Sequence, residues 1–146
     1  VLADVLSYVN KNFKPEFMID FATLTGAVLV ALGNRASGLM GNDDKLIKLI
    51  KKSSKATDEK VWELPLWPEY TREIKGKYAD IKNLGNAGLA GTITAGAFLK
   101  EFVGEGIPWV HFDIAGTAWG SKPSSIDPKG SATGVGIRLV LDMLEN

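Results

Sequence analysis

The fold is decided by residues 16–26, which read EFMIDFATLTG. Residues 16–24 are almost continuously apolar, which is typical of a strand in a sheet that is covered on both faces. Thr25 and Gly26 predict a tight turn, and the apolar residues 27–32 after it predict a short helix. A strand, a turn and a helix in this order favour an α/β fold built in layers.

The rest of the chain continues the alternation of strands and helices. Residues 109–114, WVHFDI, predict a second buried strand, and further strands are expected over residues 35–41 and 60–64. A strand or an extended run is expected over residues 78–84. Helices are expected over residues 2–10, 68–76, 92–103 and 135–144, and a helix capped by Asn42 or Asp43 is expected to run to Lys55. Residues 115–134 predict a long loop, and loops of this length are usually functional or disordered.

The composition indicates one globular domain and excludes several classes of protein. The 146 residues fit a single domain, and 17 basic residues balance 17 acidic ones, which argues against a nucleic-acid binder. The absence of cysteine excludes disulfides and Cys-ligated zinc, and the single histidine, His111, excludes a His-rich zinc site. No apolar run approaches the roughly 18 residues that span a membrane, and no signal peptide is recognisable. We therefore expect a cytoplasmic protein.

The start of the chain is also informative. Residues 1–9, VLADVLSYV, are already in helical rhythm, with no initiating methionine and no capping Ser, Thr, Asp or Asn before them. We therefore expect a chain that was cut inside or just before a helix.

Two strand ends are candidates for a ligand site, and the first is the turn at Thr25 and Gly26. Open α/β sheets bind ligands at the carboxyl ends of their strands, where the N–H groups of the following helix are free. Gly26 would let a ligand approach the main chain closely. The same turn is equally typical of an ordinary connection between a strand and a helix, so both interpretations stay open.

The second candidate is HFDIAGTAW, residues 111–119, where a strand runs into the long loop. Strand alternation places His111, Asp113 and Ala115 on one face and the apolar residues between them on the other. His111 and Asp113 could share a metal ion or a proton, or they could form a satisfied buried pair. One histidine without a Gly-x-Ser-x-Gly elbow supports no Ser/His/Asp triad, and the glycine-rich residues 85–91 lack the lysine of a phosphate-binding loop.

A series of segments along essentially the whole chain resembles the cytosolic leucine aminopeptidase family, the two-metal aminopeptidases. The segments are VLAD at 1–4, ATLTGA at 22–27, WELPL at 62–66, ADIKNLG at 79–85, GTITAGAFL at 91–99, HFDIAGTAW at 111–119 and KGSATG at 129–134. Each segment alone is a modest signal, and their common order makes the resemblance specific.

The resemblance implies a three-layer αβα sandwich of the zinc-exopeptidase type, in which residues 1–146 form the C-terminal part of the catalytic domain. In this family a lysine and four acidic residues bind two divalent metal ions, zinc, manganese or similar, and all of them precede the point where this chain begins. The catalytic lysine, and the signature arginine that holds a bicarbonate, lie there too. We therefore predict no catalytic and no metal-binding residue in this chain. The parent protein is expected to be a metallo-aminopeptidase, and the isolated chain is expected to be inactive.

The resemblance also implies six substrate-binding residues, which are Thr23, Leu24, Gly26, Leu84, Ala115 and Ala118. The main chain at positions 23, 24 and 26 would hydrogen-bond the substrate backbone. Positions 23, 26, 115 and 118 would line the pocket for the N-terminal side chain, and position 84 would touch the following residue. Small residues at 26, 115 and 118 would leave room for a leucine-like terminus. Structural roles are assigned to Asp20, Asp80, His111 and Asp113.

The partners that the resemblance implies are peptide substrates and further copies of the protein. The family is hexameric, and some oligomer contacts are expected from this chain, whereas nucleic acid and membrane are not expected as partners. Two other functions stay open. The chain could be a non-catalytic scaffold or assembly module, which would fold and self-associate without binding metal. It could also be a small-molecule or anion-binding α/β domain that uses the Thr25-Gly26 turn, in which case phosphate or a nucleotide would raise its melting temperature.

Overall fold

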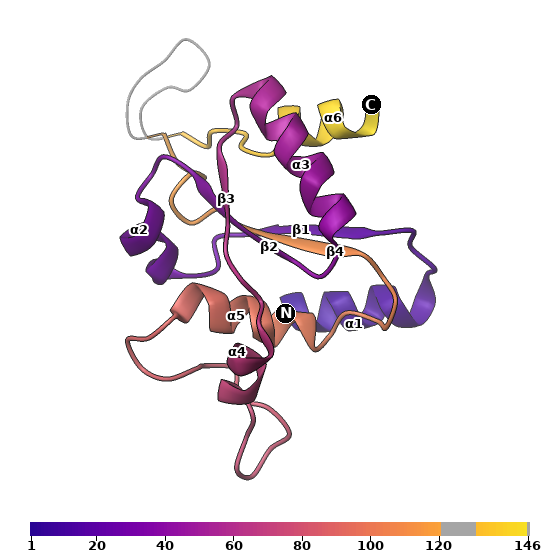
Figure 1. Ribbon diagram of the computed structural model, residues 1–146, viewed down its shortest axis with the longest axis vertical. Helices are drawn as coiled ribbons and strands as arrows, with labels where there is room; N and C mark the ends of the chain where they lie inside the picture. The colour runs from indigo at the N-terminus through magenta and orange to yellow at the C-terminus, as the bar shows by residue number, and fades with distance from the viewer. Residues whose placement is uncertain (121–130, 146) are drawn as a thin grey trace.

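A mixed four-stranded β-sheet forms the middle layer of the computed structural model, which describes residues 1–120 and 131–145 (Figure 1). The strands are β1 (Met18–Ala22), β2 (Ser37–Gly41), β3 (Val61–Glu63) and β4 (Trp109–Asp113), and they lie in the order β1-β4-β2-β3. β1 is parallel to β4 and β2 is parallel to β3, whereas β2 and β4 are antiparallel. The sheet therefore joins two parallel pairs through one antiparallel contact.

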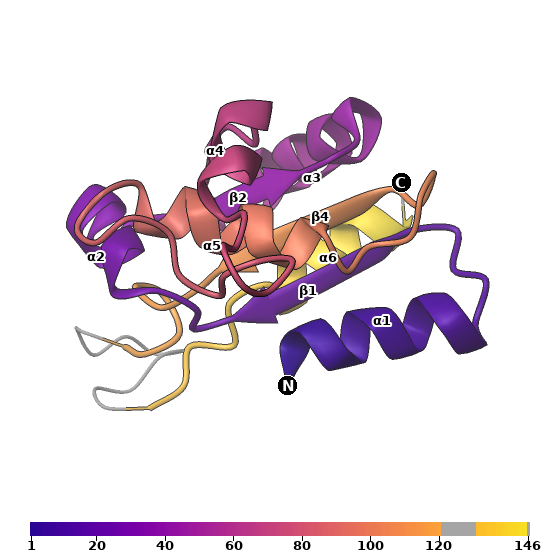
Figure 2. The same ribbon diagram turned by 90° about the horizontal axis from the view of Figure 1, so that it is seen from below.

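Helices cover both faces of the sheet, which confirms the layered α/β fold. α3 (Asp44–Thr57) and α6 (Ile137–Glu145) lie on one face, and α1 (Leu2–Asn12) and α5 (Gly91–Lys100) lie on the other, as Figures 1 and 2 show. The short helices α2 (Gly26–Leu32) and α4 (Pro68–Glu73) both contact α5. The arrangement is that of an αβα sandwich.

Side-chain alternation along β4 separates two hydrophobic cores. Val110 and Phe112 belong to the core beneath α3 and α6. Trp109 belongs to the opposite core, where it packs with Leu6 of α1 and Leu99 of α5. Trp109, Val110 and Phe112 are each at most 1% exposed, so β4 is buried on both faces, as its apolar sequence predicts.

Local sequence signals explain where three of the helices begin. The Thr25 side chain caps α2 by accepting a hydrogen bond from the Val28 N–H at 3.2 Å. The Asp43 carboxylate caps α3 by accepting one from the Leu46 N–H at 2.7 Å, which confirms the second of the two predicted caps. Pro68 is the first residue of α4, where its missing N–H removes no helical hydrogen bond.

Residues 78–84, for which the sequence predicts a strand or an extended run, form no strand of the sheet. The segment folds back on the end of α4 instead of joining the sheet: the Lys82 N–H donates to the Ile74 carbonyl at 2.7 Å, and an isolated antiparallel bridge joins Lys75 to Ile81. The stretch lacks the apolar alternation that a half-buried strand needs, and Tyr78 is 94% exposed.

The other predicted elements are present, with ends that differ by a few residues, as is usual at element boundaries. β1 covers residues 18–22 within the predicted 16–24, α5 ends at Lys100 before the predicted 103, and α6 begins at Ile137 after the predicted 135. Residues 121–130 of the predicted loop lie outside the described residues. In the described part of the chain, no helix has both the length and the apolar character needed to cross a membrane.

Candidate functional site

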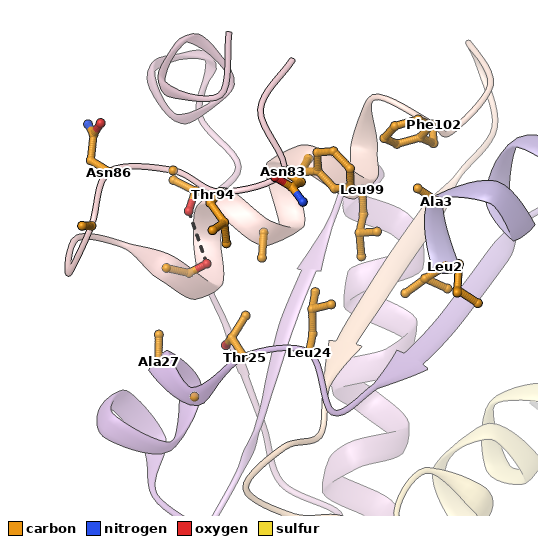
Figure 3. A pocket seen from close by; sticks show the side chains of 18 of the residues that line it. Leu2, Ala3, Leu24, Thr25, Ala27, Asn83, Asn86, Thr94, Leu99 and Phe102 are labelled. Atoms are coloured by element: carbon orange, nitrogen blue, oxygen red, sulfur yellow. Dashed lines mark hydrogen bonds between the residues drawn. The ribbon is translucent and has the colours of Figure 1, made fainter. Parts of the chain in front are cut away.

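A hollow of about 790 Å³ lies between four segments that are far apart in the sequence (Figure 3). The segments are the start of α1, the turn from β1 into α2, the loop at residues 83–88, and α5. Leu24 points toward Leu99 in Figure 3, and Leu2 and Phe102 pack in the same hydrophobic cluster. Much of the wall is therefore apolar, as in most small-molecule sites.

The carboxyl ends of β1 and β4 bring the two predicted strand exits together. The parallel register pairs Ala22 with Asp113, and the Ile114 N–H donates to the Ala22 carbonyl at 2.9 Å. The turn after β1 and the turn after β4 therefore start side by side at one edge of the sheet. This edge is where open α/β sheets bind ligands.

The six predicted substrate-binding residues divide into two groups. Those that line the hollow are Leu24, Gly26 and Leu84. The others, Thr23, Ala115 and Ala118, are not among its lining residues and lie in the turns at the neighbouring strand ends. The role of all six in binding a substrate stays a prediction.

The turn after β4 is tightly built and packs against the end of α2. The Ala118 N–H donates to the Ile114 carbonyl at 2.9 Å, which closes the turn that contains Ala115. A Cβ on Gly116 would lie 2.1 Å from the carbonyl oxygen of Gly33, so only glycine fits between the two segments. Ala115 and Ala118 are both partly buried.

The Asp113 carboxylate holds the turn between β1 and α2. Its Oδ1 accepts hydrogen bonds from the N–H groups of Leu24 at 3.1 Å, Thr25 at 3.4 Å and Ala115 at 3.2 Å. Its Oδ2 accepts one from the Thr25 hydroxyl at 2.6 Å, and that hydroxyl accepts one from the Val28 N–H. The N–H groups of Leu24, Thr25, Ala115 and Val28 are thus used inside the protein.

Gly26 is the first residue of α2 and borders open space. A Cβ built on it would meet no atom within 4 Å, and its backbone is not among those with positive φ. The fold itself therefore does not require a glycine here. A ligand that approached the main chain closely would require one.

Leu84 is carried to the rim of the hollow by a loop that packs on α5 through a glycine. Leu84 is 77% exposed. A Cβ on the next residue, Gly85, would lie 2.7 Å from the hydroxyl oxygen of Thr94, so the loop main chain rests directly on the helix. The glycine-rich sequence of residues 85–91 does not reveal this contact, because glycine is typical both of a loose loop and of a close approach between main chains.

His111 and Asp113 do not pair with each other. Side chains two residues apart on one strand are separated by about 7 Å, whereas the register of β1 and β4 places Asp20 opposite His111. The His111 Nδ1 lies 2.5 Å from Asp20 Oδ1, and the Trp109 Nε1–H donates to Asp20 Oδ2 at 2.7 Å. The hypothesis that His111 and Asp113 share a metal ion or a proton is therefore wrong.

The described residues do not fit the two divalent metal ions that the resemblance implies. Among residues 1–120 and 131–145, no group of three or more His, Asp or Glu side chains is placed to hold a metal ion. The two acids of the central strands, Asp20 and Asp113, already accept hydrogen bonds from internal donors.

Comparison with known proteins gives one consistent result. A family model described as the cytosol aminopeptidase family, catalytic domain, matches residues 1–141. Probable cytosol aminopeptidases from Geobacter sulfurreducens and Cenarchaeum symbiosum are 54% and 51% identical to the chain, and each alignment covers 99% of it. A third, from Phytoplasma australiense, is 47% identical over 100% of the chain. The chain spans only 28% to 30% of the length of these relatives.

Proposed function

The chain belongs to the cytosol aminopeptidase family, and we propose that it forms the C-terminal part of the catalytic domain of a metallo-aminopeptidase. In this proposal the whole enzyme removes N-terminal residues, preferably leucine-like ones, from peptides with two divalent metal ions, zinc, manganese or similar. The described chain supplies walls of the substrate pocket. The metal ligands, the catalytic lysine and the arginine that holds a bicarbonate belong to other parts of the polypeptide.

The observation that carries this proposal is the hollow at the start of α2. Leu24, Gly26 and Leu84 meet there from two segments that are about sixty positions apart in the sequence. Gly26 borders open space, so a peptide main chain has access to the backbone at this point. Phe98 and Leu99 of α5 make the opposite wall of the hollow apolar.

The chemistry of this chain is binding and orientation of the peptide. When bound, the metal ions would supply an activated water and an anchor for the free amino group. The Leu24 N–H donates to Asp113, so we infer that Leu24 offers its carbonyl oxygen to the substrate. Holding a substrate in its reactive geometry contributes several kcal/mol to lowering a barrier.

We assign the N-terminal side chain of the substrate to the second wall, at the neighbouring strand ends. Thr23, Ala115 and Ala118 lie in turns that start side by side after β1 and β4. Their short side chains leave space for a large apolar group. Leu84, on the loop that packs on α5, would contact the following residue of the peptide.

The proposal is tested by comparing the isolated chain with the whole polypeptide in which it occurs. Each protein is incubated with a leucine anilide and zinc, manganese or cobalt, and anilide release is measured with and without a chelator. We expect turnover by the whole polypeptide and none by the chain, because a two-metal site needs several ligands. Chelator-sensitive turnover by the pure chain would refute the assignment of the metal ligands, and an inactive, metal-loaded whole polypeptide would refute the function.

We also propose that the whole protein is a cytoplasmic homo-oligomer, a hexamer, with some contacts from this chain. A second hollow beside α2 is lined by Ala and larger apolar residues, among which Val30 is 90% and Leu89 is 63% exposed. Apolar surface of this kind is typical of protein–protein contacts. Analytical sedimentation of the whole polypeptide measures its oligomeric state. We expect Val30→Asp and Leu89→Asp to shift the protein from the hexamer to smaller species. If the whole polypeptide assembled without any peptidase activity, the scaffold alternative would replace the enzyme.

A further inference from the structure

We propose that Asp113 is a positioning residue that sets the geometry of the substrate pocket by joining the three segments that carry its walls. This inference rests on the proposed function of the pocket. It changes the assignment of Asp113 from a purely structural residue to one that acts on the substrate through the main chain and through Thr25.

The first two segments are joined directly by the Asp113 carboxylate, which is 0% exposed. Its Oδ1 accepts hydrogen bonds from Leu24 and Thr25 in the turn after β1, and from Ala115 in the turn after β4. One oxygen atom therefore fixes the main chain on both sides of the strand ends. The substrate-binding positions 23, 24, 26, 115 and 118 all lie in or directly beside these two turns.

The third segment is joined through two hydroxyl groups. The Thr25 hydroxyl donates to Asp113 Oδ2 at 2.6 Å and lies 3.0 Å from the hydroxyl of Thr92, which is 4% exposed. Because the Thr25 hydrogen is directed to the carboxylate, the Thr92 hydroxyl must be the donor to Thr25. Thr92 is in the first turn of α5, the helix on which the loop with Leu84 rests. Thr92 thus donates to Thr25 and Thr25 donates to Asp113, and these two hydrogen bonds connect α5 to the ends of β1 and β4.

The chemical nature of the group supports a role beyond packing. Moving a carboxylate out of water is costly unless its oxygens are hydrogen-bonded, and a well-packed apolar group would fill the same space without that cost. The four donors that reach Asp113 are uncharged and come from residues 24, 25 and 115. Each of these residues is in a turn that we assign to the pocket. The carboxylate therefore holds the main chain of these turns in place.

Asp20 provides a matched control, because it is a second acid within the same sheet. Its carboxylate binds the side chains of His111 and Trp109, both of which belong to β4. Neither partner lines the hollow. Loss of the Asp20 carboxylate should therefore weaken the sheet without moving the turns that we assign to the pocket.

The test uses four variants of the whole polypeptide loaded with metal: Asp113→Asn, Thr25→Val, Thr25→Ser and Asp20→Asn. Asparagine retains an oxygen for the N–H groups but presents an NH₂ to the Thr25 hydroxyl, which reverses its hydrogen bond. Valine removes that hydroxyl, and serine restores it. For each variant, kcat and KM are measured on leucine and alanine anilides, with metal content and the melting temperature recorded in parallel.

We expect Asp113→Asn and Thr25→Val to lower kcat/KM for leucine about 10- to 100-fold at full metal content, since misplacement by about 1 Å costs on the order of a hundredfold. The leucine-to-alanine ratio of kcat/KM should change at least about fivefold, which a loss of folded protein alone cannot produce. Thr25→Ser should recover most of the loss. Asp20→Asn should lower the melting temperature and leave the ratio unchanged.

Amide hydrogen exchange separates failure of this inference from failure of the proposed function, since it requires no activity. Exchange at Leu24, Thr25 and Ala115 should become at least about tenfold faster in Asp113→Asn and Thr25→Val, and stay unchanged in Asp20→Asn. If the whole polypeptide without substitutions is inactive, the proposed function is refuted, and the exchange data still test the positioning role of Asp113. Unchanged exchange, or an unchanged leucine-to-alanine ratio in an active parent, would overturn the positioning role. If Asp113→Asn does not fold, Thr25→Val decides the result by the same readouts.

Discussion

The substitution Gly26→Ala separates the fold from the substrate site most cleanly. A Cβ at this position meets no atom within 4 Å, and position 26 is the first residue of α2. Alanine at a glycine position with compatible backbone usually stabilises a protein by about 0.4–1 kcal/mol, because the unfolded chain loses freedom. The melting temperature should therefore stay the same or rise slightly.

The effect on turnover should have the opposite sign. A peptide main chain in contact with the Gly26 Cα would be displaced by about 1 Å, and such a displacement costs on the order of a hundredfold in rate. That loss corresponds to about 2.7 kcal/mol in the activation barrier. Because the main chain is common to all substrates, turnover of both the leucine and the alanine anilide should fall.

The assay measures kcat/KM on both anilides in the whole polypeptide, together with thermal unfolding and metal content. Ala56→Gly, in an exposed position of α3 on the face of the sheet opposite α5, is the control. It should lower stability by up to about 1 kcal/mol and leave turnover unchanged. If Gly26→Ala is as active as the parent, the substrate does not approach the start of α2, and the assignment of this hollow to the substrate is refuted.

Three further substitutions test the neighbouring walls. Ala115→Leu should shift preference from leucine toward alanine substrates, where each methylene of fit is worth roughly 1–3 kcal/mol; an unchanged ratio of kcat/KM would remove the β4 turn from the specificity pocket. Gly85→Ala should displace the loop with Leu84 from α5, since the new Cβ would lie 2.7 Å from Thr94. It should raise KM for peptides with a bulky second residue, whereas KM for anilides of a single residue should change little. Gly116→Ala should destabilise the fold by about 1–3 kcal/mol or more, because its Cβ would lie 2.1 Å from a backbone oxygen, and denaturant unfolding measures that loss.

The layered fold could be predicted because burial leaves a strong trace in the sequence. β4 is covered on both faces, and its residues 109–113 are apolar or internally paired. β1 is also mostly apolar, but it is the outermost strand of the sheet on its side, and of its five residues only Met18 is buried. Residues 78–84 do not join the sheet, because a short stretch with isolated apolar residues does not specify which segment it pairs with. Ile81 forms one bridge with Lys75 rather than a ladder. The antiparallel contact of β2 with β4 also had no local signal.

The candidate site was predictable in its segments and not in its connections. Side-chain alternation correctly placed His111 and Asp113 on one face of β4, but it could not identify partners that lie about ninety positions away. Only the parallel register of β1 and β4 shows that His111 meets Asp20. The same register places Asp113 next to the turn at Thr25. Hydrogen bonds between distant segments depend on the tertiary structure, so composition and spacing do not reveal them.

The most direct test of the central claim is a hybrid enzyme. In the hybrid, this chain replaces the matching segment of the Geobacter sulfurreducens relative, with which it shares 54% identity over 145 residues. Turnover of a leucine anilide by the hybrid is measured with manganese or zinc, and the intact relative is measured in parallel. If this chain supplies substrate-pocket walls, the hybrid turns over the anilide, a chelator stops it, and Gly26→Ala within the hybrid lowers the rate about a hundredfold. A folded hybrid that binds as much metal as the active relative but shows no turnover would contradict the claim.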